Sequence, residues 1–422
     1  MRAYSLRLNT ADSPSIADFY LGESPNPMTP PEGFDRFREE FAWAGSVYNA
    51  TLLGAPEPRV RVRIDGREVD VINLASYNYL GLARHPEVIA AAQEALARYG
   101  TGACGAPLVS GMTDLHDELG HRLSAFLGRE ATVLFNSGFG GAMGCLAGLL
   151  RRGDAAILDE RSHFSLVDGA LLSRAKLELF AHNDPTALDA MLTRHADRRR
   201  LVVLEGIYSM DGHAANLPAL CEVAERHDAS VLVDEAHSVL LSGAHGRGEC
   251  EAQGVESRVG LYYGTLSKAF AGVGGFVSGP EETIEYLRGF AHTYANSCAL
   301  PPATVAGLIA ALDVATRDDT LRLRLRANAD YFRSELHGMG LDTGTSTSHV
   351  VPILLGDDRA ALYLMGIELR RRGVFLAVVD FPAVPQDQVR FRASITAAHT
   401  RADLDEALDI IREVVACGLS DV

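Results

Sequence analysis

Short apolar runs alternate with segments of helical spacing through the middle of the chain. Six of these runs have the length of strands, and amphipathic stretches such as Pro218 to His227 separate several of them. The runs are Ala131–Phe135, Ala155–Leu158, Leu177–Phe180, Leu201–Leu204, Val231–Val233 and Gly260–Tyr263. This alternation predicts a mostly parallel sheet covered by helices on both faces, which binds its ligands at the carboxyl ends of the strands.

The flanking regions have different patterns. A polar arm and a helical pattern over Phe34–Ala44 precede two alternating strands, Val60–Ile64 and Val69–Leu74, with Asp65-Gly66 as a hairpin turn between them. The elements expected after residue 300 are helices Ala303–Thr316 and Asp319–Leu336, strands Val350–Leu355, Val374–Val378 and Val389–Ile395, and helix Ala402–Val415. We therefore predict an N-terminal arm and helix (1–60), a large domain (61–300) and a small α+β domain (301–422).

Composition narrows the class of protein. The chain has 422 residues, 47% of them hydrophobic and 22% charged, which is ordinary for a globular protein. A net charge of -16 argues against nucleic acid and anionic membranes as partners. The sequence has no apolar run of signal-peptide or membrane-spanning type, and its six cysteines form no C-x-x-C pair. We expect a cytoplasmic protein with reduced thiols and no metal site.

One lysine stands out. Lys176 and Lys268 are the only lysines among 39 basic residues. Lys176 has the surroundings of a surface residue, whereas Lys268 lies in Gly264-Thr265-Leu266-Ser267-Lys268, just before a glycine-rich stretch. A lysine amine can lose its proton and form a Schiff base with a carbonyl, which arginine cannot do. Lys268 is therefore a candidate nucleophile.

Two further candidate sites follow predicted strands. Ser137-Gly138-Phe139 opens a helix, whose free backbone N–H groups can bind a phosphate. Asp234 ends another strand, where it could pair with a protonated ring nitrogen, and His237 could face the same ligand. The surrounding Asp-Glu-Ala-His also matches a helicase acidic box, but helicases need a P-loop, and neither lysine follows a glycine.

A histidine and two arginines complete the set. His163 could stack on an aromatic cofactor or simply cap a loop. Arg390 and Arg392 alternate onto one face of a late strand, either as a carboxylate clamp or in surface ion pairs. A lysine for an imine, an aspartate for a pyridinium nitrogen, a helix N-terminus for a phosphate and an arginine for a carboxylate together indicate a pyridoxal 5'-phosphate (PLP) site.

The sequence resembles the α-oxoamine synthase family of PLP enzymes from about Asn73 to Ala416. Its motifs are closest to serine palmitoyltransferase and 8-amino-7-oxononanoate synthase. The motifs that carry the resemblance are Tyr77-Asn78-Tyr79-Leu80-Gly81, Leu204 to Gly212, Val233-Asp234-Glu235-Ala236-His237-Ser238, His245-Gly246-Arg247-Gly248, Gly264 to Lys268, Ala299-Leu300-Pro301-Pro302, and Arg392 with Thr396-Ala397-Ala398-His399. The resemblance implies an aminotransferase fold of type I, with a mostly parallel seven-stranded sheet between helices and a smaller α+β C-terminal domain.

The resemblance also implies roles for single residues. Lys268 would hold the cofactor as a Schiff base, Asp234 would bind the ring nitrogen, His237 the ring hydroxyl, and His163 would stack on the ring and act with them in catalysis. The other residues implied are Ser137, Gly138, Phe139 and Thr265 for the phosphate, Ser209 near the ring hydroxyl, Ser297 for the phosphate of a neighbouring subunit, Arg392 for the amino-acid carboxylate, and Tyr77 or Asn78 for the substrate site. Ser297 implies a homodimer.

The activity that the resemblance implies is the condensation of an amino acid with an acyl thioester, usually with loss of CO2, to give an α-amino ketone. Many members carry a Ser-Arg pair where this chain has Gly105-Ala106-Pro107-Leu108, so the thioester could be carried by CoA or by an acyl carrier protein. Two alternatives stay open. One is another reaction of the same fold, by an aminotransferase or an aldolase, and the other is a non-catalytic subunit of a heteromeric synthase.

Overall fold

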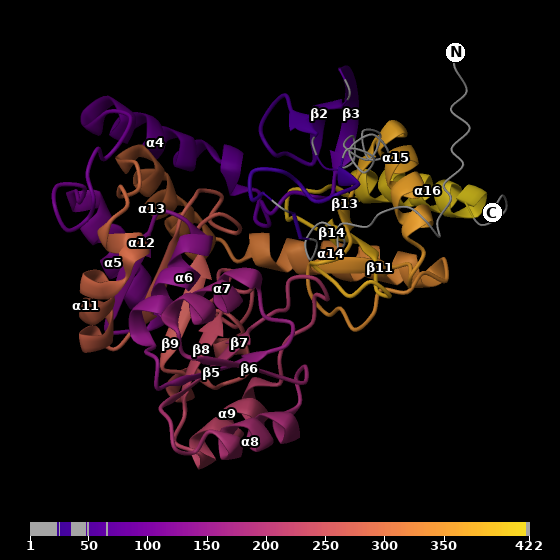
Figure 1. Cartoon of the computed structure of the whole chain (residues 1–422). Coiled ribbons are helices and arrows are strands. Elements are labelled where there is room, and N and C mark those ends of the chain that lie inside the picture. Colours follow the sequence, from indigo (N-terminus) through magenta and orange to yellow (C-terminus); the bar gives the residue numbers. More distant parts are fainter. Residues whose placement is uncertain (1–22, 25, 35–47, 49, 65, 419–422) are drawn as a thin grey trace. The chain divides into compact units, whose positions relative to one another are not determined.

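The computed structural model describes residues 23–24, 26–34, 48, 50–64 and 66–418 (Figure 1). Contacts divide the chain into two compact units. The sheet unit comprises Tyr77–Ala327 with Thr396–Ala398, and the terminal unit joins Met1–Ser76, Asn328–Ile395 and His399–Val422. The helix expected over Phe34–Ala44 lies, apart from its first residue, outside the described residues.

A seven-stranded sheet forms the centre of the sheet unit, in the order β4-β10-β9-β8-β7-β5-β6. The strands are β4 (Ala131–Phe135), β5 (Ala155–Asp159), β6 (Lys176–Phe180), β7 (Arg200–Glu205), β8 (Ser230–Asp234), β9 (Leu261–Thr265) and β10 (Gly275–Gly279). Strand β10 is antiparallel to both of its neighbours, β4 and β9, and the pairs from β9 to β6 are parallel. The predicted fold class is confirmed, although the sequence pattern did not identify β10.

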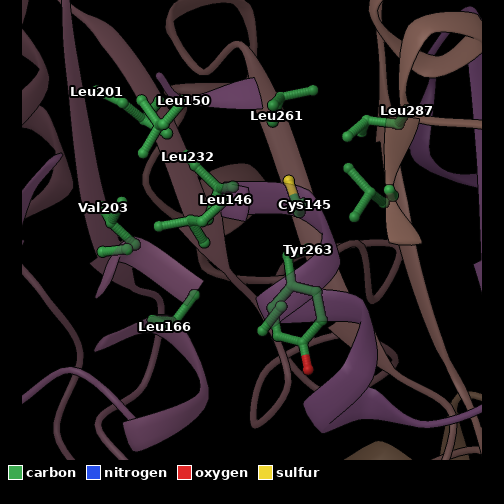
Figure 2. Close-up of a cluster of buried hydrophobic side chains, with 14 of the residues drawn as sticks. Cys145, Leu146, Leu150, Leu166, Leu201, Val203, Leu232, Leu261, Tyr263 and Leu287 are labelled. Atoms are coloured by element: carbon green, nitrogen blue, oxygen red, sulfur yellow. The ribbon is translucent and has the colours of Figure 1, made fainter. Parts of the chain in front are cut away.

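Apolar side chains fill the space between the sheet and helices α6 (Gly138–Leu149) and α7 (Phe164–Ser173), which lie side by side (Figure 1). Figure 2 shows Cys145 and Leu146 of α6 facing Val203, Leu232 and Tyr263 of the sheet. The residues that alternate with these on the strands, such as Val202 and Val231, are buried as well. Both faces of the sheet are therefore covered, and each buried Leu or Val contributes about 1.5–3 kcal/mol of transfer free energy.

The sheet unit contains further helices. They are α4 (Pro86–Tyr99), α5 (Asp114–Leu127), α8 (Pro185–Arg194), α9 (Leu217–Arg226), α10 (Glu249–Ala252), α11 (Glu281–Phe290), α12 (His292–Ala295) and α13 (Pro302–Arg317), with 3-10 turns η1 (Leu82–Arg84) and η2 (Glu256–Arg258). Pro86 begins α4, where its missing N–H costs nothing, and Gly100 ends it with φ 81°.

The terminal unit contains two small sheets. One, in the order β1-β2-β3-β12, is built from β1 (Thr51–Leu52), β2 (Arg59–Ile64), β3 (Arg67–Asn73) and β12 (Val374–Phe375). The other, in the order β11-β14-β13, is built from β11 (Val350–Leu354), β13 (Ala377–Val379) and β14 (Arg390–Ser394). Helices α15 (Arg359–Arg371) and α16 (Arg401–Gly418) belong to this unit, and α14 (Thr320–Gly338) begins in one unit and ends in the other.

The boundaries of these units differ from the expected domains. The hairpin of β2 and β3, expected in the large domain, belongs to the terminal unit because β3 pairs with β12, with Ile72 opposite Val374. Helix α13, expected in the small domain, belongs to the sheet unit because it packs along α4. Among the described residues, no helix is long and apolar enough to cross a membrane.

Candidate active site

A cavity of about 290 Å³ opens in the sheet unit at the carboxyl ends of the parallel strands. Its walls come from the segments that follow β4, β5, β7, β8 and β9. The lining residues are Ser137, Gly138, Phe139, His163, Glu205, Ser209, Asp234, Ala236, His237, Tyr263, Thr265, Ser267, Lys268 and Val273. The structure thus brings together every residue expected to bind the cofactor except Ser297.

One end of the cavity is suited to an anion. Helix α6 begins here, and its first N–H groups, at Gly138 and Phe139, have no acceptor within the helix. Ser137 caps the helix, its Oγ accepting from the N–H of Gly140 at 2.9 Å. A Cβ on Gly138 would lie 2.6 Å from Oγ1 of Thr265, so this turn requires glycine. The N–H groups and the Thr265 hydroxyl fit a phosphate.

Lys268 lies in the turn after β9, where the N–H of Ala271 donates to its carbonyl at 2.9 Å. Its positive charge acts on three other groups of the cavity. It opposes the effect of burial on the pKa of Asp234 and of Glu205, and it helps to lower the pKa of His163. The other lysine, Lys176, is exposed on the edge strand β6, with its Nζ 3.6 Å from Oε1 of Glu178. Of the two lysines, Lys268 is therefore the one that lines the cavity.

Two buried carboxylates end neighbouring strands. Glu205 and Asp234 face each other in the register of β7 and β8 and are 2% and 5% exposed. Burial raises the pKa of Asp234 to about 7. Burial also raises the pKa of Glu205 well above its usual value, and the charge of Asp234 adds to this rise. A cation beside Asp234 would restore its charged form, which suits a protonated ring nitrogen.

His163 serves as a cap and lines the cavity at the same time. Its Nδ1 accepts from the N–H of Ser165 at 3.3 Å at the start of α7, so a neutral ring carries its proton on Nε2. Its own backbone N–H donates to Oε1 of Glu205 at 2.6 Å. Burial, followed by the charge of Lys268, lowers the pKa of His163 to about 4. The ring therefore stays neutral at physiological pH, as a stacking role requires.

His237 is held by a contact with Tyr79. The hydroxyl of Tyr79, which is fully buried, lies 3.0 Å from Nδ1 of His237. The two residues before Tyr79 do not line the cavity. Tyr77 is 45% exposed, and Oδ1 of Asn78 accepts from the N–H of Ala83 at 3.2 Å. Their proposed contact with substrate thus rests on the resemblance.

The remaining expected residues have other surroundings. The Oγ of Ser297 accepts from Nδ2 of Asn136. Asn136 directly precedes Ser137-Gly138-Phe139, the turn that opens α6 and that we call the phosphate turn. Arg392 belongs to the terminal unit, where it is 2% exposed and donates to Oγ of Ser394 at 3.3 Å. Arg390, also buried, donates through Nε to the carbonyl of Gln388 at 2.9 Å. The assignment of Arg392 to the substrate carboxylate stays a prediction.

Glu205, Ser267 and Tyr263 also line the cavity, although no role was predicted for them from their motifs. The hydroxyl of Tyr263 donates to the carbonyl of Gly138 at 2.8 Å and so supports the phosphate turn. Ser267 lies with its Oγ 2.8 Å from Oγ1 of Thr265. Glu205 ends an apolar strand just as Asp234 does, but only the register of β7 against β8 shows that the two carboxylates are neighbours.

Comparison with known proteins shows the family. The model of aminotransferase class I and II matches residues 69–411. The chain belongs to this family. Within the family, 8-amino-7-oxononanoate synthase of Thermoanaerobacter pseudethanolicus is 39% identical over 378 residues, which cover 89% of this chain and 95% of the relative. Serine palmitoyltransferase of Sphingobacterium spiritivorum is 38% identical over 349 residues, covering 82% and 87%.

Solved structures of the same family have the same fold. Serine palmitoyltransferase from S. paucimobilis, with bound PLP–myriocin aldimine, superposes with a TM-score of 0.87 at 33% identity, covering 92% of this chain and 98% of that chain. The resemblance seen in the motifs is confirmed. This member of the aminotransferase class I and II family is an acyltransferase of the α-oxoamine synthase type, and its cofactor is PLP. The residues of the cavity fit that cofactor, with a glycine-cradled anion site, a buried carboxylate and a lysine.

Proposed function

We propose that the enzyme condenses an amino acid with an acyl thioester. A bond forms between the α-carbon and the acyl carbon, the carbon–sulfur bond breaks, and the products are an α-amino ketone, CO2 and a free thiol. The observation that carries the proposal is the presence of Lys268, Asp234 and His163 in one cavity of an α-oxoamine synthase-type chain. A non-catalytic subunit is disfavoured because this set is complete.

In this proposal, Asp234, Lys268 and His163 have different roles in the reaction. PLP, when bound, supplies the electron sink that stabilises negative charge at the α-carbon. Asp234 would face the ring nitrogen and favour its protonated form, which strengthens that sink. Lys268, once its Nζ is released, would take the proton from the α-carbon as general base. The neutral ring of His163 would cover one face of the cofactor and keep water away.

A thiol-release assay tests the proposal. The purified enzyme, with PLP, is given each of the twenty amino acids and an acyl-CoA or acyl carrier protein donor, without a keto acid. We expect release of free thiol and CO2 in equal amounts with at least one amino acid, and a change in the visible absorption of the cofactor with the same one. Transfer of the amino group to a keto acid, or cleavage of a β-hydroxy amino acid without a thioester, would instead support an aminotransferase or an aldolase.

Arg392→Ala is expected to weaken binding of the amino acid and to leave PLP binding nearly unchanged. Loss of a buried guanidinium that pairs with the substrate carboxylate should cost about 2 kcal/mol or more. Titration of the holoenzyme with the amino acid, followed by absorption, measures the change. Arg412→Ala, on the exposed Arg412 of α16, is the matched control. If Arg392→Ala binds the amino acid as tightly as the wild type does, Arg392 does not bind the carboxylate, and Arg390 is the next residue to test.

Two carriers of the acyl group remain, CoA and an acyl carrier protein. CoA brings a phosphorylated adenosine, which basic side chains usually bind, and Pro107 lies near the place where relatives have an arginine. A carrier protein delivers the thioester on its phosphopantetheine arm and needs no adenosine pocket. The ratio of kcat/KM for one acyl chain on the two carriers decides, and a tenfold preference for CoA, about 1.4 kcal/mol, would exclude the carrier protein as the natural donor.

We also propose that the enzyme works as a homodimer in the cytoplasm. Exposed apolar side chains, Leu108, Val109 and Met112, lie on the loop that begins at Gly105. The N–H of Ala299 donates to the carbonyl of Gly105 at 2.9 Å, so this loop adjoins the segment of Ser297. An apolar surface beside Ser297 supports an interface through which Ser297 reaches a second site. Sedimentation velocity at assay concentration measures the assembly state.

A further inference from the structure

Three titratable side chains outside the cavity form a hydrogen-bonded chain. Nδ1 of His182 lies 2.8 Å from Oδ1 of Asp159, and Nε2 of His182 lies 2.7 Å from Nε2 of His213. The Asp159 side chain is fully buried and that of His182 is 12% exposed. The ring of Tyr208 packs edge-on against His182, with the ring centroids 4.5 Å apart. The reaction proposed above uses none of these groups.

The chain joins two segments that line the cavity. Asp159 ends β5, and its Oδ1 accepts from the N–H of Arg161 at 2.9 Å, two residues before His163. His213 closes the loop that presents Ser209, because the N–H of Tyr208 donates to the His213 carbonyl at 3.0 Å. A second tie joins the same segments, an ion pair of 2.9 Å between Arg161 and Asp211. The positions of His163 and Ser209 therefore depend on one network.

The Nε2 atoms of the two histidines can form a hydrogen bond only if a single proton lies between them. The Asp159 carboxylate keeps a proton on Nδ1 of His182, so in the neutral pair His213 donates from Nε2 to His182. One added proton still leaves a single proton between the Nε2 atoms. A second added proton places a hydrogen on both of them, and the bond is lost.

The charged groups around the pair act on it in opposite directions. Burial lowers the pKa of His213, and the positive charges of His182 and Arg161 lower it further, whereas Asp211 and Asp159 raise it. A histidine whose folded-state pKa lies below its unfolded value contributes stability that is fully present above the unfolded value of about 6.5 and is lost as pH falls below it through the folded-state pKa. The network should therefore loosen in mild acid.

We propose that Asp159, His182 and His213 are positioning residues that fix His163 and Ser209 at the cofactor cavity, and that they do so only while the two histidines share a proton. The cofactor, PLP, is the ligand whose binding depends on them. Its affinity should therefore fall in mild acid for a reason that lies outside the cavity itself. Because the readout is cofactor binding, the proposal stands or falls separately from the identity of the substrates.

The test is a titration of the apoenzyme with PLP, followed by absorption, at pH 7.5 and pH 5.5. His213→Gln places an amide that can donate or accept at the same point and does not titrate. His213→Ala removes the contact. His227→Gln is the matched control, because His227 lies 3.0 Å from Oδ1 of the surface residue Asp189 in the same unit. The pH dependence of PLP itself and of the rest of the cavity is common to all four proteins and cancels in the comparison.

We expect the PLP affinity of the wild type and of His227→Gln to fall up to about tenfold more between the two pH values than that of His213→Gln, because acid breaks the same single hydrogen bond. His213→Ala should bind PLP up to about tenfold more weakly at pH 7.5, because one net hydrogen bond is worth up to about 1.5 kcal/mol. An equal pH slope in wild type and His213→Gln would overturn the proposal. If His213→Ala fails to fold by circular dichroism, the slope of His213→Gln alone decides.

Discussion

Lys268→Arg is expected to give a protein that still binds PLP but no longer turns over. The turn at Gly138 and the carboxylate of Asp234, which we propose to hold the cofactor, are unchanged in this variant. Arginine keeps its proton, so it can neither attach the cofactor covalently nor act as the base at the α-carbon. Loss of a general base alone costs about 10²–10⁴-fold in rate. The measurement is kcat by thiol release, together with the absorption spectrum of bound PLP.

The chain supplies its own control, because Lys176 and Lys268 are its only lysines. Lys176→Arg should keep full activity, since its side chain is exposed beside Glu178. Borohydride treatment of the wild type, followed by peptide mass spectrometry, should place the reduced cofactor on Lys268. A label on Lys176, or undiminished turnover in Lys268→Arg, would remove Lys268 from the centre of the site.

Elements with local signals could be predicted from the sequence, and those that depend on distant pairing could not. Helix α4 begins with Pro86 and ends at Gly100, so its bounds follow from local chemistry. Strand β10 is short and has a glycine at each end, and it becomes a strand because Val277 pairs with Val133 on one side and Tyr263 on the other. The unit boundaries also follow from remote contacts, such as that of Ile72 with Val374.

The site shows the same division. Lys268, Asp234 and the phosphate turn were found because each follows a strand in a recognisable motif, and the carboxyl ends of parallel strands meet at one edge. The role of Glu205 was missed because it depends on the register of β7 against β8 and on the backbone of His163. The contact of His182 with His213 was missed because it joins two loops that are far apart in the chain.

Asp234→Asn is expected to change both the pH dependence of stability and the binding of PLP. The folded-state pKa of Asp234, about 7, lies above its unfolded value, because burial disfavours the charge. Between these two values the folded apoenzyme binds more protons than the unfolded chain does. Its free energy of unfolding therefore falls as pH rises from about 4 to 7, and asparagine, which does not titrate, removes that loss.

With the cofactor bound, Asp234→Asn is expected to destabilise the folded protein instead of stabilising it. A protonated ring nitrogen beside Asp234 would make the charged carboxylate favourable, and removing one partner of such a buried pair costs about 3–5 kcal/mol. We therefore expect Asp234→Asn to bind PLP at least about 100-fold more weakly and to lose most turnover, while its apoenzyme unfolds at the same temperature as the wild type or higher at pH 8. Thermal unfolding at pH 5 and pH 8, with and without PLP, measures both effects.

Asp313→Asn, on the surface, is the control. If Asp234→Asn instead kept the PLP affinity and the pH dependence of the wild type, Glu205 would be the carboxylate that faces the ring nitrogen.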